Sequence, residues 1–200
     1  MKSISRIIIL LIFISCNNQK QEVKTIRHIN ETKKYLIEKN INDLSFSLVN
    51  GVLLYQDKPY SGIVNELYSD RNFKTKSEYL EGERSGYYKG WYSDGSKQFD
   101  RYYKKGLKVG IHIGWYKNNQ KMFEFHFNDS GEYNGSVKEW YVNGILSSSF
   151  NYTNGIEEGS QQMWQPNGKI RANYVARNGE RFGLIGLKKC YSVNTKNEEF

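Results

Sequence analysis

The residues of this sequence that could do acid–base or metal chemistry are few and widely spaced. Its three histidines are His28, His112 and His126. A metal site needs several His, Cys, Asp or Glu ligands brought together at short spacing, and only His112 and His126 could approach each other, on neighbouring strands. We expect Glu124 to point to the face opposite His126, so no ligand set forms. The histidines are therefore interpreted as incidental surface residues, and no metal or cofactor is predicted.

The carboxylates give no stronger indication of catalysis. Glu157-Glu158 and the pair Glu81 and Glu83 lie in turn-like segments and are interpreted as solvated loop residues. Glycoside cleavage needs two carboxyl groups that face each other across the scissile bond, and nothing in the spacing selects such a pair. The glycines follow a turn period and precede no helix, so neither a nucleophile elbow nor a phosphate loop is present. We predict that the protein is not an enzyme.

One of the two cysteines, Cys16, has a context that indicates a modification. Lys2 and Arg6 precede an apolar run of eight residues, 7–14, which is too short to span a bilayer of about 30 Å as a helix. A small residue before a cysteine, directly after such a run, resembles a bacterial lipoprotein processing site. The resemblance implies that residues 1–15 are a signal peptide and that Cys16 carries lipid. The alternative is an ordinary secretory signal with an incidental cysteine.

The segments beside the signal bear on location and on the chain ends. Asn17 follows Cys16 where aspartate would favour inner-membrane retention, so we expect a lipid anchor in the outer membrane of a bacterial envelope. Residues 16–24 are polar and predict a tether, residues 25–43 predict a short helix with a thin apolar stripe, and residues 188–200 predict a polar tail. Cys190 is left without a partner if Cys16 is lipidated, and we expect it to be buried and inert.

The elements between these ends follow from a repeat. The four tryptophans, Trp91, Trp115, Trp140 and Trp164, lie 24, 25 and 24 residues apart. A set of glycines keeps the same step: Gly62, Gly86, Gly110, Gly135, Gly159 and Gly183. The 25-residue step comes from one inserted residue near Ser130. Such a fixed period indicates one small structural unit copied along the chain, and residues 44–187 are predicted to form the repeat domain.

Each unit has the pattern of a β-hairpin. Asp94-Gly95 and Asn143-Gly144 separate apolar runs, and such pairs favour tight hairpin turns because both positions tolerate positive φ. The runs alternate with period two. We predict an all-β fold: an elongated single-layer antiparallel meander of repeated hairpins, with a lead-in hairpin at Asn50-Gly51 and the short N-terminal helix.

Aromatic residues at equivalent positions should form ladders across the strands. The tryptophans form one ladder, and Tyr79, Tyr103, Phe127 and Tyr152, ended by Ala176, form another. Such cross-strand pairs contribute roughly 0.2–1 kcal/mol each, so the tryptophans are interpreted as structural. Tyr92, Tyr116 and Tyr141 follow tryptophans and should lie on the opposite face. They are candidate ligand residues for a sugar surface, or they simply cover the second face of the sheet.

The stretch from Gly86 to Lys97, Gly-x4-Trp-Tyr-x-Asp-Gly-x-Lys, resembles the MORN-repeat variant found in bacterial proteins of the YwqK-type antitoxin family. The resemblance covers about residues 51–183. It implies a hairpin-repeat fold, and it makes an antitoxin or immunity protein that binds a toxin one expected function. The first unit departs from the motif, with Leu67 in place of tryptophan and Arg71 in place of the turn glycine, as in an atypical terminal copy.

The charge of the chain limits the partners. With 29 basic and 21 acidic side chains the net charge is +8, and loss of Lys2 and Arg6 with the signal leaves 27 against 21, or +6. The basic residues are spread along the strands, which favours solvation of exposed faces, although acidic partners would also suit them. The run 101–105 mixes basic and aromatic residues, but an exported protein rarely meets nucleic acid, so nucleic acid is not expected.

These observations lead to three functional hypotheses. The first is a non-catalytic envelope lipoprotein whose repeat sheet binds a protein partner. The second is an antitoxin or immunity protein, and the third is a surface that binds glycan or cell wall. Repeat arrays serve as binding surfaces through their extended faces, which agrees with all three.

Overall fold

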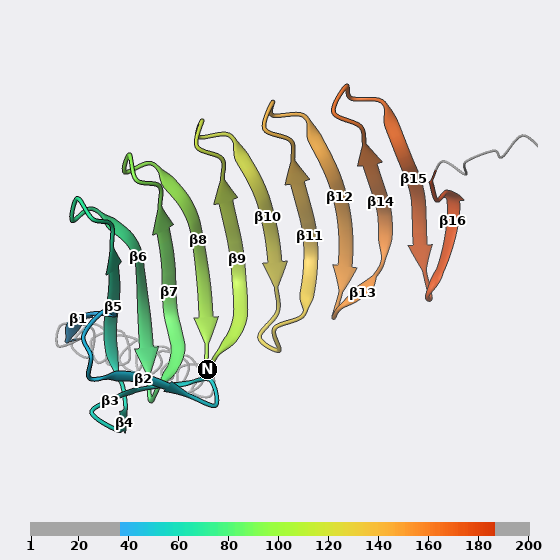
Figure 1. Ribbon diagram of the computed structural model, residues 1–200. Helices are drawn as coiled ribbons and strands as arrows, with labels where there is room; N and C mark the ends of the chain where they lie inside the picture. The colour runs from blue at the N-terminus through green and yellow to red at the C-terminus, as the bar shows by residue number, and fades with distance from the viewer. Residues whose placement is uncertain (1–36, 187–200) are drawn as a thin grey trace, which may run out of the picture. The chain divides into compact units, whose positions relative to one another are not determined.

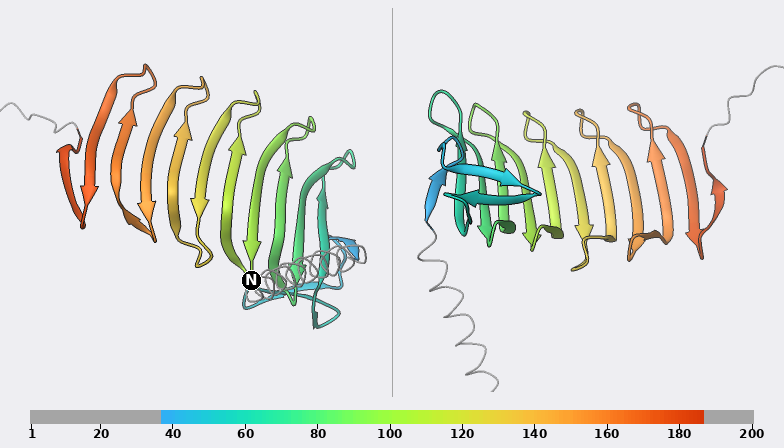
Figure 2. Two further views of the ribbon diagram at one scale, coloured as in Figure 1. Left: turned by 180° about the vertical axis from the view of Figure 1, so that it is seen from behind. Right: turned by 60° about the horizontal axis from the view of Figure 1, so that its bottom comes forward.

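The structure, a computed structural model, describes residues 37–186, and it is all-β in that range (Figure 1). The described strands lie almost entirely in the second of two compact units of the chain, Lys39–Phe200. A 13-stranded sheet runs in chain order from β5 to β16, with β1 beside β5 and β13 beside β12, and three strands form a separate small sheet. The predicted all-β meander of hairpins is confirmed, and Figure 2 shows the same strand order from behind and from below.

The first edge strand of the long sheet is β1, and from β5 onward each strand pairs antiparallel with the next along the sheet. Its strands are β1 (Glu38–Asn40), β5 (Gly62–Leu67), β6 (Phe73–Leu80), β7 (Glu83–Trp91), β8 (Lys97–Lys104), β9 (Leu107–Trp115), β10 (Lys121–Phe127), β11 (Tyr133–Trp140), β12 (Leu146–Thr153), β13 (Ile156–Glu157), β14 (Gly159–Trp164), β15 (Ile170–Arg177) and β16 (Glu180–Leu184). The small sheet contains β2 (Phe46–Val49), β3 (Val52–Tyr55) and β4 (Lys58–Pro59). Each repeat unit is one hairpin, β5–β6, β7–β8, β9–β10, β11–β12 or β14–β15.

The predicted turns close these hairpins. Gly95, Asn119 and Gly144 all have positive φ. Each of these residues donates its backbone N–H to the carbonyl three residues earlier, as Gly95 does to Tyr92 at 2.9 Å. Within each turn the Asp or Asn side chain accepts a backbone N–H two residues on. The local sequence therefore determines these turns by itself, because both the backbone conformation and the polar groups are satisfied within a few residues.

A second set of turns joins one unit to the next at the opposite ends of the strands. Glu81-Gly82 and Asn154-Gly155 have positive φ at both residues, which is the conformation of the tightest hairpins. The inserted residue enlarges the corresponding turn between β10 and β11. There Asn128 Oδ1 accepts the backbone N–H groups of Ser130 and Glu132, both at 3.0 Å. The insertion thus stays inside one turn, and the strand order continues unchanged.

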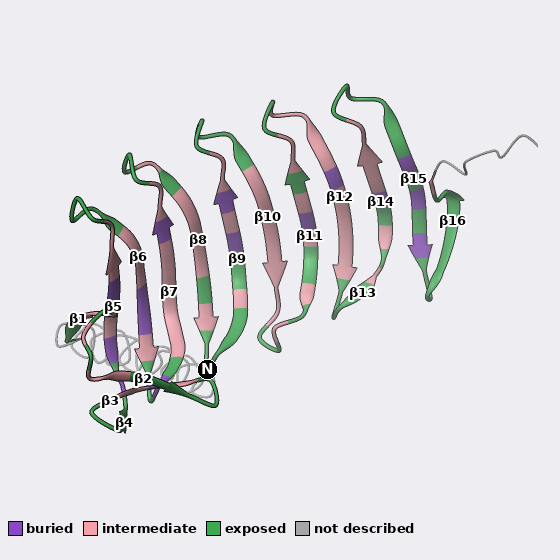
Figure 3. Cartoon of the chain, in the orientation of Figure 1, coloured by how far each residue is buried: buried purple, intermediate pink, exposed green. Residues whose placement is uncertain are grey.

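The two faces of the long sheet differ in what they carry. Strand alternation places Trp115 with Ile111 and Ile113 on one face, which we call the tryptophan face. Phe123 and Phe125 pair with Gly114 and His112 on the other, which we call the phenylalanine face. The buried strand residues of the repeat units lie mostly on the phenylalanine face (Figure 3). They include Val64, Ser77, His112, Val137, Ser148, Gln161, Ala172, Tyr174 and Ala176.

The small sheet packs on the phenylalanine face at the start of the repeat. Leu53 and Tyr60 form a buried cluster with Val64 of β5, and Tyr79 of β6 packs against it. The backbone also joins the two sheets, because Leu53 N–H donates to the carbonyl of Gly82 at 2.9 Å. The predicted hairpin at Asn50-Gly51 is confirmed as β2–β3. It belongs to this separate sheet, which packs on β5 and β6 and contacts the turn that joins β6 to β7.

The prediction of a helix over residues 25–43 is wrong for the part that the structure describes. Residues 38–40 form β1, and turns follow it. Ile41 N–H donates to the carbonyl of Asn65 at 2.8 Å, so this segment pairs its backbone with the first edge of the sheet. Pairing with an open sheet edge outweighs the weak helical stripe. The predicted signal peptide, Cys16, the predicted tether, His28, Cys190 and the predicted tail 188–200 lie outside the described residues.

Candidate interaction surface

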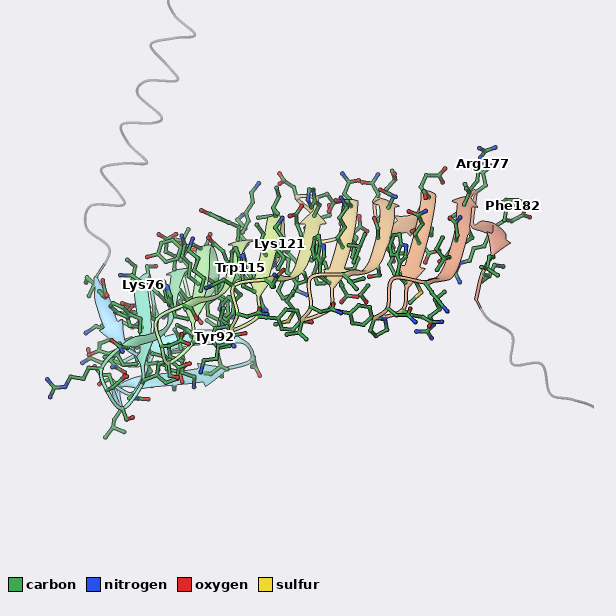
Figure 4. The ribbon with its side chains drawn as sticks, turned by 90° about the horizontal axis from the view of Figure 1, so that it is seen from above. Lys76, Tyr92, Trp115, Lys121, Arg177 and Phe182 are labelled. Carbon is green, nitrogen blue, oxygen red and sulfur yellow. The ribbon has the colours of Figure 1, made fainter. Side chains whose placement is uncertain are left out.

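The predicted tyrosines lie on the phenylalanine side of the sheet, and their hydroxyl groups are engaged in the fold. Figure 4 shows Tyr92 on the side opposite Trp115 and Lys121. Tyr92 Oη donates to the backbone carbonyl of Trp115, in the next unit, at 2.8 Å. The same bond recurs from Tyr68 to Trp91, from Tyr116 to Trp140 and from Tyr141 to Trp164, at 2.8–3.0 Å. We call this set of hydrogen bonds the tyrosine clamp. It gives the tyrosines a structural role that is independent of the predicted sugar contact.

The tryptophans form a row on their face in which other side chains separate the rings. Lys97 Nζ lies 5.7 Å from the ring centroid of Trp115, and Lys121 Nζ lies 5.4 Å from that of Trp140. At the start of the row, the ring of Phe73 takes the place of the lysine beside Trp91. Cation–π contacts at exposed sites contribute about 0.5–1 kcal/mol. The row is therefore both part of the sheet and a surface that presents indole rings and ammonium groups together.

Large apolar side chains are exposed on the tryptophan face. Tyr102 and Ile111 are each 48% exposed, and Val175 and Phe182, neighbours on β15 and β16, are 41% and 55% exposed. Phe73 and Ile170, which flank the ends of the tryptophan row, are also exposed. No described strand residue that the pairing register places on the phenylalanine face is among the exposed large hydrophobic residues. Exposed apolar side chains gathered on one face are typical of an interaction surface.

A charged cluster on the tryptophan face corrects one prediction. Glu124 Oε2 accepts from Lys121 Nζ at 2.5 Å and Glu124 Oε1 lies 3.2 Å from His126 Nε2. Glu124 and His126 therefore share a face, because residues two apart on a strand point the same way. The hydrogen bond from Lys121 is the main cause that lowers the pKa of Glu124, and the bond to His126 adds to it. This cluster is an ion pair beside Trp140.

His112 is a structural residue of the phenylalanine face, and the prediction of an incidental surface histidine is wrong for it. It is 3% exposed and pairs with Phe125, so it cannot meet His126 across the sheet. Its ring lies 5.4 Å from Tyr103 and 4.7 Å from Phe127, bridging two rings of the second predicted ladder. His112 Nε2 lies 2.7 Å from the carbonyl of Tyr102, so this nitrogen carries the proton. Burial lowers the pKa of His112.

The acidic pairs have different surroundings. Glu81 and Glu83 are exposed at a turn, as expected. Glu157 belongs to β13 and both of its oxygens are bound, by Arg181 Nε at 2.9 Å and by Arg181 Nη2 at 3.0 Å. Tyr174 Oη also donates to this carboxylate, at 3.2 Å. The interpretation of Glu157 as a solvated loop residue is therefore wrong, because β16, a strand that does not pair with β13, supplies an arginine that the local sequence does not reveal.

Two features are absent from the described part of the chain, a metal-ligand cluster and a membrane-spanning helix. Residues 37–186 contain no group of three or more His, Cys, Asp or Glu side chains that could hold a metal ion. Within the same residues no helix is long and apolar enough to cross a membrane.

Sequence reasoning did not identify the exposed residues Tyr102, Ile111, Val175 and Phe182 as a surface. The period-two pattern places apolar residues on both faces, and it does not say which face the rest of the chain covers. The available signal was the alternation of lysine with apolar residues on one face.

Comparison with known proteins identifies no family for the chain. No protein-family model matches it, and no curated protein matches it. One similar solved structure is the crystal structure of a Staphylococcus aureus TarM mutant in complex with Fondaparinux, alpha-GlcNAc-glycerol and UDP. The match has 12% sequence identity and a TM-score of 0.29, and it covers 67% of this chain but only 23% of that one. A likeness at this level carries no argument about activity.

Proposed function

We propose that this protein is a non-catalytic lipoprotein of a bacterial envelope whose repeat sheet binds a protein partner through its tryptophan face. The observation that carries the proposal is the asymmetry of the sheet. The chain covers its phenylalanine face with its own rings and with the small sheet, whereas the tryptophan face presents exposed Tyr102, Ile111 and Val175. Apolar and aromatic side chains with scattered cations are the composition that protein partners use.

The lysines of this face support a partner with acidic groups around an apolar centre. Lys97 and Lys121 are exposed beside the tryptophans. Lys89 Nζ lies 3.4 Å from the carboxylate of Asp100 on the neighbouring strand β8. Charges at the rim of an interface increase the rate of association and select the partner, while apolar contacts hold it. The proposed lipid on Cys16 would keep this surface near the membrane, at high local concentration toward other envelope proteins.

A crosslinking experiment with face-specific variants tests the binding surface. We expect the protein to capture an envelope partner, and we expect the double variant Ile111→Asp, Val175→Asp to reduce this capture about tenfold, because two charges enter an apolar contact. Leu48→Asp is the matched control, since Leu48 is 70% exposed on the small sheet. Equal capture by wild type and by the tryptophan-face variant, with both proteins folded, would contradict the proposal.

The anchor has its own test. Cys16→Ser should move the protein from the membrane fraction to the soluble envelope fraction, because the lipid would have no attachment point. A membrane fraction that is unchanged in this variant would overturn the lipid anchor and would leave the binding surface untouched.

An antitoxin or immunity protein is the second candidate function. It rests on the resemblance of the motif Gly86–Lys97 to the repeat of that family, and in the structure these residues belong to the hairpin of β7 and β8. Such a protein would use the same kind of binding surface, and its partner would be a toxin. Growth arrest by the product of a neighbouring gene, relieved by this protein but not by its Ile111→Asp, Val175→Asp variant, is the expected result. A neighbouring gene product without toxicity would remove this candidate.

A further inference from the structure

Two arginines on the phenylalanine face lie over aromatic rings of β7 and β8. Arg84 Cζ lies 4.3 Å from the ring centroid of Tyr88, and Arg101 Cζ lies 4.4 Å from that of Phe99. The two rings are themselves in contact, with centroids 4.7 Å apart. Arg101 is also the cross-strand partner of Tyr88. The four side chains therefore form one continuous patch on β7 and β8, which we call the arginine patch.

Neither arginine is neutralised by an acidic side chain of the described residues. Arg84 Nε donates to Ser77 Oγ at 3.2 Å, and Arg101 has only its ring contacts. The buried Glu78 carboxylate lies beside the patch, against Gly86 between Arg84 and Tyr88, and it accepts the backbone N–H of Tyr87 at 3.2 Å. A guanidinium group that stacks on a ring keeps its N–H donors directed outward in the ring plane, where they suit a carboxylate bound through two parallel hydrogen bonds.

The same chain shows this arrangement with its carboxylate in place. Arg181 lies 5.3 Å from the ring centroid of Tyr174, and its guanidinium holds both oxygens of Glu157 at 2.9 and 3.0 Å. Arg181 and Tyr174 are on the phenylalanine face, as are Arg84 and Tyr88. The arginine patch thus repeats the ring and the guanidinium of this site, but no carboxylate of the described residues is bound to either of its guanidinium groups.

We propose that the arginine patch binds an acidic segment of a protein partner, with one carboxylate on Arg84 and another on Arg101. In an extended segment, side chains two residues apart point to the same side and are spaced about 6.6 Å along the chain, so two carboxylates of one short segment can face the patch together. Charge complementarity selects this occupant, because the chain carries a net charge of +8 and neither guanidinium of the patch is bound to a carboxylate of the described residues. The site is separate from the contact proposed for the tryptophan face.

Fluorescence anisotropy with a defined probe tests the arginine patch. The probe is a fluorescein-labelled octapeptide of alternating glutamate and alanine, and the comparison peptide has glutamine in place of glutamate. We expect the glutamate peptide to bind the full chain and the glutamine peptide to bind at least about tenfold more weakly, because charge-assisted hydrogen bonds are lost. Arg84→Gln with Arg101→Gln should weaken binding of the glutamate peptide by a similar factor.

The matched control removes the same charge from the other face. Arg171→Gln with Arg177→Gln alters two exposed arginines of β15 and should leave binding nearly unchanged. Arg84→Lys with Arg101→Lys keeps the charge without the planar fork and should give an intermediate loss, provided that circular dichroism shows a folded sheet.

Equal weakening by both glutamine pairs would overturn the site in favour of a general charge effect. Binding of millimolar inorganic phosphate at the patch without binding of the peptide would overturn the acidic segment as its occupant. Because neither Arg84 nor Arg101 lies on the tryptophan face, either result leaves the crosslinking test of that face independent.

Discussion

The two faces of this sheet are made from the same strands, yet only one is covered by the rest of the chain. On the phenylalanine face, small residues alternate with rings that lean over them: a Cβ atom at Gly90 would overlap the ring of Phe99, and one at Gly114 would overlap the ring of Phe123. On the tryptophan face Ile111 and Phe182 stay about half exposed. A single-layer sheet needs one face that covers itself, and the proposed partner contact uses the other face.

The largest test of this difference is to crowd the covered face. Gly114→Val puts a branched side chain where the ring of Phe123 lies, and we expect it to lower the free energy of unfolding by about 1–3 kcal/mol, the usual cost of overpacking. Ser160→Val is the matched control, since Ser160 is exposed and pairs with Val175 on the tryptophan face. Urea unfolding of both variants makes the comparison. Equal effects of the two valines would mean that the faces are not packed differently.

A smaller effect is expected when one bond of the tyrosine clamp is removed. Tyr116→Phe deletes the hydrogen bond to the carbonyl of Trp140, so the free energy of unfolding should fall by about 0.5–1.5 kcal/mol. Tyr102→Phe makes the same change at a tyrosine that is 48% exposed on the tryptophan face, and it should have almost no effect. Thermal unfolding of the two variants measures the difference, and a loss as large for Tyr102→Phe would argue against the clamp.

The smallest effect is a difference in pH dependence. Burial lowers the pKa of His112 below its ordinary value of 6.5, so the unfolded chain takes up this proton at a higher pH than the folded chain. Stability from this group is fully present above about pH 6.5 and is lost as the pH falls from there toward the lowered, folded-state pKa. We expect His112→Phe to show a flatter decline than wild type in urea unfolding between pH 7 and pH 5. An identical decline in both proteins would show that His112 does not contribute.

Much of the fold could be predicted because the deciding information is local. Asp94-Gly95 and Asn143-Gly144 determine their turns through backbone conformation and bonds within a few residues. The spacing of the tryptophans then fixes the unit length. The short helix failed for residues 38–43 because the backbone there pairs with β5, a contact with a distant part of the chain.

The surroundings of the charged and polar side chains could be predicted far less well. Arg181 and Glu157 belong to different strands, and only the register of β12 to β16 brings them together. His112 occupies a buried position that Val64 and Val137 occupy in other units. Its polar residue type, taken without this equivalence, had indicated a surface position. A register error of one residue exchanges the two faces. Without the register, sequence reasoning could not say which carboxylates would be bound and which arginines would lack an acid.

The tyrosine clamp has a consequence for how a chain of this kind can change in length. Each clamp joins a tyrosine hydroxyl to a backbone oxygen of the next unit, so the fit between neighbours does not depend on the side chains that the next unit carries. Excision of residues 110–134 would remove one whole unit and place the carbonyl of Trp140 where Tyr92 now meets that of Trp115. The boundary between units therefore has the same hydrogen bond at each clamp. Insertion or loss of a whole unit would change the length of the sheet by one fixed step without altering the contacts between the remaining units.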